Sequence, residues 1–341
     1  MPDRPSWLDE VRRPPTAVPE SATRPAPLLF DDRHRPIRTP AGWSARRGEI
    51  ASRWREFLGT IETPRAVEPI KTLEEDRRAG VRRRLIRYEA EPGLPVEAYL
   101  LEPLDLPATP RRPGVVVCHS TTADTIRQPS GLEGPEDKHI GLDLARRGYV
   151  ALCPRCFLWQ YSRAGKIAEA VDWLHRRRPG VSGMAKMLLD AVRAVDVLVS
   201  LPGVDPKRIG SIGHSLGAKE VLYLSAFDSR VRATVSSEGG IGLTYSNWDA
   251  PWYLGASIRR PGFPLDHGQV LALTAPRAFL LIGGESADGD WSWPYVEEAL
   301  PVWSLLEAPD AVGLFNHRQG HAFPPSSRTR SAEWLDWFLR A

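Results

Sequence analysis

The chain has 341 residues, which is long enough for one large α/β domain with insertions or for two smaller domains. Its hydrophobic content of 42% and charged content of 26% are typical of a globular protein, and a net charge of +3 is too small to indicate a nucleic-acid partner. Three cysteines do not make a disulfide framework and no apolar run resembles a secretory signal or a membrane span, so we expect a soluble cytoplasmic protein without a membrane partner.

Residues 1–45 are rich in proline and arginine and show little periodicity. Such a segment cannot bury enough apolar surface to fold alone. We expect a tail, or an arm laid over a main domain of residues 46–341, with Trp7 and residues 28–30 as its apolar anchors.

A helix is expected over 49–58, followed by strands 84–88 and 96–101 around a proline- and glycine-containing turn. After residue 113, apolar strands alternate with amphipathic helices. The further expected strands are 115–118, 149–153, 209–212, 231–236, 278–282 and 312–315, and the helices are 139–147, 183–200, 218–226, 294–306 and 331–339. This alternation predicts an α/β fold in which a mostly parallel central sheet carries helices on both faces and binds ligands at the carboxyl ends of its strands. An aromatic segment, about 240–264, is expected as an insertion or lid after the sixth strand.

The most informative motif is Gly-His-Ser-Leu-Gly at 213–217, directly after strand 209–212 and directly before helix 218–226. A strand that enters a tight turn and leaves it as a helix is the context in which G-x-S-x-G holds a nucleophile. Both glycines are needed, because a side chain at either position would collide with the neighbouring strand or helix. The pattern predicts that Ser215 holds its hydroxyl above the sheet edge as a nucleophile.

A nucleophilic serine needs a base, and the base needs an acid that orients it. In this kind of fold the base follows the last strand. We expect the base to be His321, because it lies on the loop after strand 312–315 and Gly320 lets that loop turn inward. His317 is the weaker candidate, because it is only two residues past the strand.

Two carboxylates compete for the role of the acid. Asp288 lies on the loop after strand 278–282 and is the preferred acid. Glu238, which follows strand 231–236, is the alternative. Either carboxylate could fix the tautomer of the imidazole. If Glu238 is not the acid, we expect it to contact substrate or to pair with Lys219.

The developing oxyanion needs two backbone donors. We expect the amides of Leu216, next to the nucleophile, and of Thr121, on the loop after strand 115–118. The two late histidines have metal-ligand spacing, but no further ligand cluster accompanies them. Cys153 and Cys156 have redox spacing but follow a strand instead of opening a helix. We expect neither a metal nor an organic cofactor.

Several aromatic residues are expected near the mouth of the site: Trp248 and Trp252 in the insertion, and Trp291 after strand 278–282. They would stack on sugar rings or shape an acyl pocket. Packing of an inserted lid is the equally favoured alternative.

Over residues 80–341 the chain resembles the α/β-hydrolases, and within them the bacterial acetyl xylan esterase-like and dienelactone hydrolase-like esterases. The segments that carry the resemblance are VCHSTT at 117–122, LARRGYV at 144–150, VDPKRIGSIGHSLG at 204–217, LTAPR at 273–277 and QGHAFP at 319–324. The resemblance implies Ser215 as nucleophile, His321 as base and Asp288 as acid.

The chain is also similar to glucuronoyl esterases. There a glutamate after the strand that follows the elbow can supply the acid, and a lysine four residues beyond the serine contacts sugar. Glu238 and Lys219 occupy those places. That family has an arginine directly after its serine and a cysteine before it, where this chain has Leu216 and His214. The missing arginine argues against a uronate ester.

We therefore expect a serine carboxylic-ester hydrolase that acts on small acyl esters, including acetylated carbohydrates. The alternatives are a glucuronoyl-ester, lactone or amide hydrolase with the same triad, and a binding protein that retains the serine without turnover. The expected partner is a small-molecule ester, and the sequence does not indicate an oligomeric state.

Overall fold

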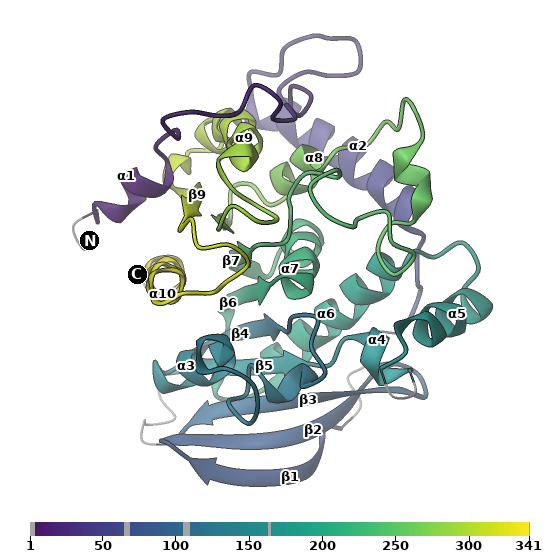
Figure 1. Ribbon diagram of the computed structural model, residues 1–341, viewed down its shortest axis with the longest axis vertical. Helices are drawn as coiled ribbons and strands as arrows, with labels where there is room; N and C mark the ends of the chain where they lie inside the picture. The colour runs from purple at the N-terminus through teal and green to yellow at the C-terminus, as the bar shows by residue number, and fades with distance from the viewer. Residues whose placement is uncertain (1–3, 65–68, 105–109, 163–164, 341) are drawn as a thin grey trace.

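The computed structural model describes residues 4–64, 69–104, 110–162 and 165–340. Within these residues a nine-stranded sheet has the order β1-β2-β3-β5-β4-β6-β7-β8-β9 (Figure 1). The strands are β1 (Lys71–Arg78), β2 (Val81–Glu91), β3 (Leu94–Pro103), β4 (Arg112–Cys118), β5 (Val150–Pro154), β6 (Val204–His214), β7 (Val231–Ser237), β8 (Ala278–Gly283) and β9 (Val312–Asn316). From β5 to β9 all neighbouring strands are parallel, whereas β1, β2 and β3 form an antiparallel extension that joins β5. The expected α/β fold is confirmed.

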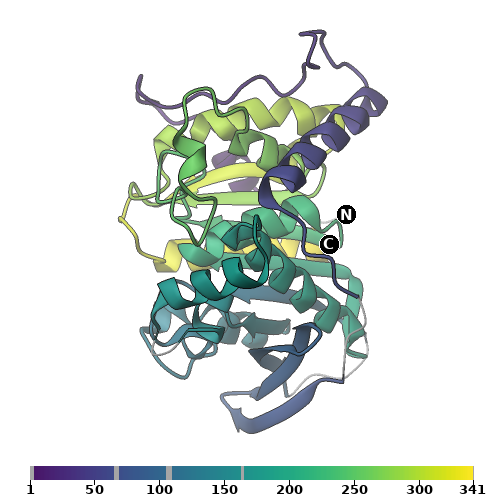
Figure 2. The same ribbon diagram turned by 90° about the vertical axis from the view of Figure 1, so that its right-hand side faces the viewer.

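Helices cover both faces of the sheet. The described helices of four or more residues in α conformation are α1 (Trp7–Val11), α2 (Pro40–Leu58), α3 (Ile140–Arg146), α4 (Phe157–Gln160), α5 (Ile167–Arg177), α6 (Gly183–Ser200), α7 (Leu216–Phe227), α8 (His267–Ala272), α9 (Trp293–Leu305) and α10 (Pro325–Arg340). In Figure 1, α3 and α10 lie on one side of the sheet, and α6 and α7 lie on the other. Figure 2 shows α2 crossing the outside of the molecule, where it contacts α8.

One strand, β1, and four helices, α1, α4, α5 and α8, were missed by the sequence pattern, and α2 and α10 begin earlier than expected. β1 was not expected, because seven of its eight residues are exposed and it shows no apolar alternation. The aromatic segment 240–264 therefore follows the seventh strand, β7. α2 begins before residue 49, where Thr39 Oγ1 accepts the Gly42 amide at 3.1 Å and Pro40 occupies the first turn.

The first residues lie over the main body of the chain. Within the expected arm, Leu8 and Val11 of α1 are fully buried, and the Trp7 ring lies 6.0 Å from that of Trp334 on α10. The Leu28 amide donates to Glu298 of α9 at 2.8 Å. The expected boundary at residue 45 falls inside α2, and residues 1–3 lie outside the described part of the chain.

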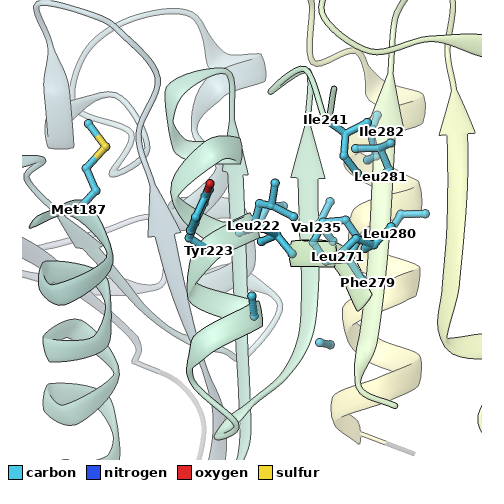
Figure 3. Close-up of a cluster of buried hydrophobic side chains, with 14 of the residues drawn as sticks. Met187, Leu222, Tyr223, Val235, Ile241, Leu271, Phe279, Leu280, Leu281 and Ile282 are labelled. Atoms are coloured by element: carbon cyan, nitrogen blue, oxygen red, sulfur yellow. The ribbon is translucent and has the colours of Figure 1, made fainter. Parts of the chain in front are cut away.

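The core places the elbow helix firmly against the sheet. Figure 3 shows Leu222 of α7 beside Val235 of β7. Both side chains, and those of the β8 residues 279–282, are at most 2% exposed. Burial of each side chain of this size contributes about 1.5–3 kcal/mol to the free energy of folding. Packing on β6 and β7 therefore holds α7, which follows the serine, against the sheet.

Candidate active site

The turn between β6 and α7 is the sharp elbow that the motif predicts. Ser215 has φ 59° and ψ −116°, a strained backbone conformation for a residue with a side chain. A Cβ on Gly213 would lie 2.2 Å from the Gly217 carbonyl carbon, and one on Gly217 would lie 2.2 Å from the Cys118 oxygen. The Ser215 amide donates to Ser237 O at 2.9 Å, which ties the elbow to β7.

His321 reaches the serine from the loop after β9. With its proton on Nδ1, the imidazole accepts the Ser215 hydroxyl at Nε2, and these two atoms are 2.9 Å apart. Gly320, with φ 67°, donates its amide to Gly284 O at 2.6 Å and so fixes the loop beside β8. His317 lies buried instead, and its Nδ1 accepts the Gln319 amide at 3.1 Å.

The carboxylate against the imidazole is that of Glu238, directly after β7. His321 Nδ1 donates to Glu238 Oε2 at 3.2 Å. Oε2 also accepts the Ala287 amide at 2.8 Å, and Oε1 accepts the Gly284 amide. The side chain is fully buried, so these backbone donors replace the water that the charge loses.

Asp288, the preferred acid from the sequence, faces away from His321 in the structure. Its oxygens accept the amides of Gly240 at 2.7 Å and Ile241 at 2.8 Å, and the Ser292 hydroxyl at 2.8 Å. The loop after β8 folds back so that its amides meet Glu238, while the Asp288 side chain turns to the start of the insertion. Burial raises the pKa of Asp288 to about 6. The expected contact between Asp288 and the base is therefore corrected to one with Glu238.

Three comparisons with known proteins bear on the fold. A model of the dienelactone hydrolase family matches residues 96–249. A solved structure described as a glucuronoyl esterase from Solibacter usitatus superimposes with a TM-score of 0.73 at 18% identity, over 92% of this chain and 98% of that chain. The chain has the α/β-hydrolase fold.

Other similar proteins are described as esterases of two kinds. A solved structure described as a putative acetyl xylan esterase from Bacteroides fragilis has a TM-score of 0.68 at 14% identity, over 92% of this chain and 80% of that chain. A curated 4-O-methyl-glucuronoyl methylesterase from Neurospora crassa is 27% identical over 181 residues, 43% of this chain and 45% of the relative. The chain thus matches less than half the length of that relative. Both resemblances drawn from the sequence motifs are confirmed.

One expected oxyanion donor lies in the elbow itself and the other on the loop after β4. Leu216 is the first residue of α7, and the first amides of a helix have no acceptor within the helix. Thr121 is exposed on the loop after β4. The neighbouring Ser120 hydroxyl donates to His214 O at 3.2 Å, which holds this loop beside the elbow. Oxyanion binding by the two amides stays a prediction.

Of the residues expected to contact substrate, two are buried inside the protein. Trp248 is fully buried, and its indole nitrogen donates to Gly240 O at 2.6 Å. Lys219 is 3% exposed and donates to Gly239 O at 2.6 Å. The structure therefore places both inside the packing of the insertion, not at its mouth. Trp252 and Trp291 are half-buried.

The sequence reading missed a second histidine beneath the base. The His214 ring lies 4.9 Å from the His321 ring, and its Nδ1 lies 3.2 Å from Ser237 Oγ. Phe323 packs against it edge-on at 5.8 Å. Burial holds the pKa of His214 well below its usual range, so it supports the base as a neutral ring. Its place inside the G-x-S-x-G motif was the available signal.

Among the described residues, no group of three or more His, Cys, Asp or Glu side chains is arranged to hold a metal ion. In the same part of the chain, no helix has the length and apolar character needed to cross a bilayer.

Proposed function

We propose that this hydrolase is a serine carbohydrate esterase and that its substrate is a uronoyl ester of the glucuronoyl kind. The single observation that carries the esterase proposal is the hydrogen-bonded chain of three side chains. Ser215 Oγ lies 2.9 Å from His321 Nε2, and His321 Nδ1 lies 3.2 Å from Glu238 Oε2. A serine, a base and a buried acid in this order are the groups that acyl transfer requires.

In the proposed mechanism, Ser215 attacks the ester carbonyl while His321 Nε2 takes the hydroxyl proton. Glu238 accepts a hydrogen bond from Nδ1–H, stays ionised and stabilises the imidazolium that forms. The amides of Leu216 and Thr121 bind the oxyanion. The imidazolium then protonates the leaving alcohol, and a water activated by the same imidazole releases the acid from the acyl-enzyme.

Three observations support a uronoyl ester over the small acyl esters expected first. Glu238 stands where glucuronoyl esterases carry their acid, and the similar curated proteins are described as 4-O-methyl-glucuronoyl methylesterases. The side chain of His321 is 46% exposed, so the reacting groups lie at the surface. An ester carbonyl that is part of a large carbohydrate reaches such an open site more easily than it would reach a closed acyl pocket.

The second candidate substrate is an acetylated sugar. Leu216 favours it, because an apolar residue replaces the arginine that follows the serine in glucuronoyl esterases. The similarity to a structure described as a putative acetyl xylan esterase gives it further support.

A direct comparison of substrates tests the proposal. Purified protein is assayed with methyl and benzyl glucuronate esters, with acetylated xylo-oligosaccharides and with p-nitrophenyl acetate, beside Ser215→Ala. We expect the highest kcat/KM with the glucuronate esters and loss of all activity in the variant. Higher kcat/KM with the acetylated sugars would replace the uronoyl proposal with the second candidate. Equal rates for wild type and variant would reject the esterase altogether.

A further inference from the structure

The chain turns sharply directly after Glu238, and this turn decides where the carboxylate points. Glu238 has φ 56° and Gly240 has φ 75°, both in the left-handed region. Glycine adopts this region freely, but glutamate does so only where its surroundings enforce it. Contacts with residues outside the turn must therefore hold Glu238 in this backbone conformation.

Four buried side chains from outside the turn hold its peptide groups. Lys219 Nζ donates to Gly239 O at 2.6 Å, and Trp248 Nε1 donates to Gly240 O at the same distance. The carboxylate of Asp288 accepts the next two amides, at 2.7 and 2.8 Å. His267 Nδ1 donates to the last carbonyl, that of Ile241, at 2.8 Å.

Two of these side chains are ionisable, and neither makes a direct ion pair within the part of the chain that the structure describes. The Lys219 nitrogen lies 3.9 Å from the Trp248 ring centre and 5.1 Å from that of Tyr253, and burial lowers the pKa of Lys219 to about 7. Asp288 is fully buried and bound only to neutral donors. Burying ionisable groups without an ion pair is costly, so they are informative where they occur.

The contacts of Lys219 and Asp288 exclude a direct part for either side chain in the chemistry. The Asp288 oxygens are taken up by two turn amides and the Ser292 hydroxyl, and Lys219 is turned into the aromatic packing of the insertion. Lys219 and Asp288 instead share one peptide group of the turn: Lys219 donates to the carbonyl of residue 239, and Asp288 accepts the amide of residue 240 from the same peptide group and the amide of residue 241 from the next.

The geometry points to Lys219 and Asp288 as positioning residues for the triad acid: together they hold the turn so that Glu238 faces His321. These roles rest on the proposed function, because Glu238 is the acid only if that function holds. Asp288 and Lys219 thus act through Glu238. Asp288 is not the acid itself, and Lys219 is not a sugar contact.

The first test separates positioning from sugar binding at Lys219. Lys219→Met keeps the length of the side chain and removes the donor. It is assayed with p-nitrophenyl acetate, which has no sugar, and with a glucuronate methyl ester. We expect kcat to fall by about 100-fold with both esters and KM to change by less than about two-fold. A raised KM with the glucuronate ester alone, or unchanged kinetics, would overturn the positioning role.

The second test is a double-mutant cycle between Asp288 and Glu238, read with p-nitrophenyl acetate. We expect Asp288→Asn alone to lower kcat by about 100-fold, and to lower it by less than about three-fold when Glu238→Gln is already present. Effects that multiply would show that Asp288 acts independently of Glu238 and would overturn the assignment.

The controls keep both tests decisive. Asp190→Asn alters another buried carboxylate, on α6 and bound to Lys186, and is expected to leave kcat unchanged. If Asp288→Asn does not fold, Ser292→Ala removes a single bond to the same carboxylate and is expected to lower kcat less, again only when Glu238 is present. A wild type that hydrolyses no ester overturns the proposed function and this inference with it, whereas an active wild type with unaffected variants overturns this inference alone.

Discussion

Gly213 and Gly217 flank the nucleophile at the two closest backbone approaches of the elbow. An added Cβ at either position would lie 2.2 Å from a backbone atom, and backbone cannot move aside as a side chain can. Ser215 can adopt its strained conformation because Gly213 and Gly217 have no side chains and so let the backbone of the elbow pack this closely.

We expect Gly217→Ala to lower the free energy of unfolding by about 1–3 kcal/mol, because the methyl group collides with the Cys118 carbonyl. Activity should fall further than stability, since the collision separates β4 from the elbow and displaces the oxyanion donors. Urea unfolding and p-nitrophenyl acetate kinetics measure the two effects. Gly203→Ala, with no atom within 4 Å of its added Cβ, is the matched control, and equal behaviour of the two variants would contradict the expectation.

A buried carboxyl on the elbow helix makes stability depend on pH. Glu220 of α7 is 5% exposed, and burial raises its pKa from 4.5 to about 7. Between these values the folded state binds more protons than the unfolded state, so the free energy of unfolding falls as the pH rises. The loss from this group amounts to about 3 kcal/mol once the pH is above 7.

Glu220→Gln should remove this part of the pH dependence. We expect the variant and the wild type to differ little at pH 4 and the variant to be the more stable at pH 8. Urea unfolding of both proteins over this range gives the difference directly. Parallel stability curves would show that the Glu220 carboxyl titrates normally in the folded protein.

At the residue scale, the sequence predicted that Ser215 and His321 meet, as the structure shows, but not which carboxylate contacts His321. Ser215 and His321 are constrained by their own neighbours: the flanking glycines, the preceding strands and Gly320. Glu238 and Asp288 each follow a strand of the same sheet. Which of them faces the imidazole depends on a left-handed turn and on contacts 47 and 48 residues apart in the chain. No local pattern contains that information.

At the element scale, the sequence pattern missed the exposed edge strand β1. Asp76 of β1 pairs with Arg83 of β2, which donates to both of its carboxylate oxygens at 2.9 Å. The same guanidinium donates to Ser130 O at 3.1 Å and Gly131 O at 3.3 Å. The antiparallel edge is therefore joined to the segment between β4 and α3, which begins with the expected oxyanion loop.

Arg83→Met should loosen that segment. We expect the free energy of unfolding to fall by about 1.5–3 kcal/mol, since the variant leaves two carbonyls and a carboxylate without their charged donor. Hydrogen exchange should become faster over residues 125–132 and stay unchanged in α7. Arg87→Met, on the same strand but paired with Glu97 at the surface, is the control. Equal exchange in the two variants would show that the Arg83 contacts do not hold the segment.

At the scale of the whole molecule, the order of the strands assembles the site. β6 lies between β4 and β7, so Ser215 is central, with the expected oxyanion loop on one side and Glu238 on the other. The loops after β8 and β9 then complete the relay. The alternation of strands and helices predicted this arrangement, because parallel strands end at one edge. It did not predict the covering of β9 by α1, since residues 1–45 have no periodicity to read.

The docking of α1 on β9 can be tested with one glycine on β9. The effect of its substitution on the free energy of unfolding should change sign when α1 is removed. A Cβ on Gly313 would lie 2.7 Å from Val11 Cγ2 and 2.8 Å from Val11 O. In the full chain we expect Gly313→Ala to lower the free energy of unfolding by about 1–3 kcal/mol, because the methyl group pushes α1 away. In a chain that lacks residues 1–16 the collision is absent, and alanine should raise stability by about 0.5–1 kcal/mol, since glycine weakens a strand. Thermal and urea unfolding of the four proteins give the cycle. The same destabilisation in both backgrounds would mean that the strain comes from the sheet itself and that α1 does not occupy this surface in solution.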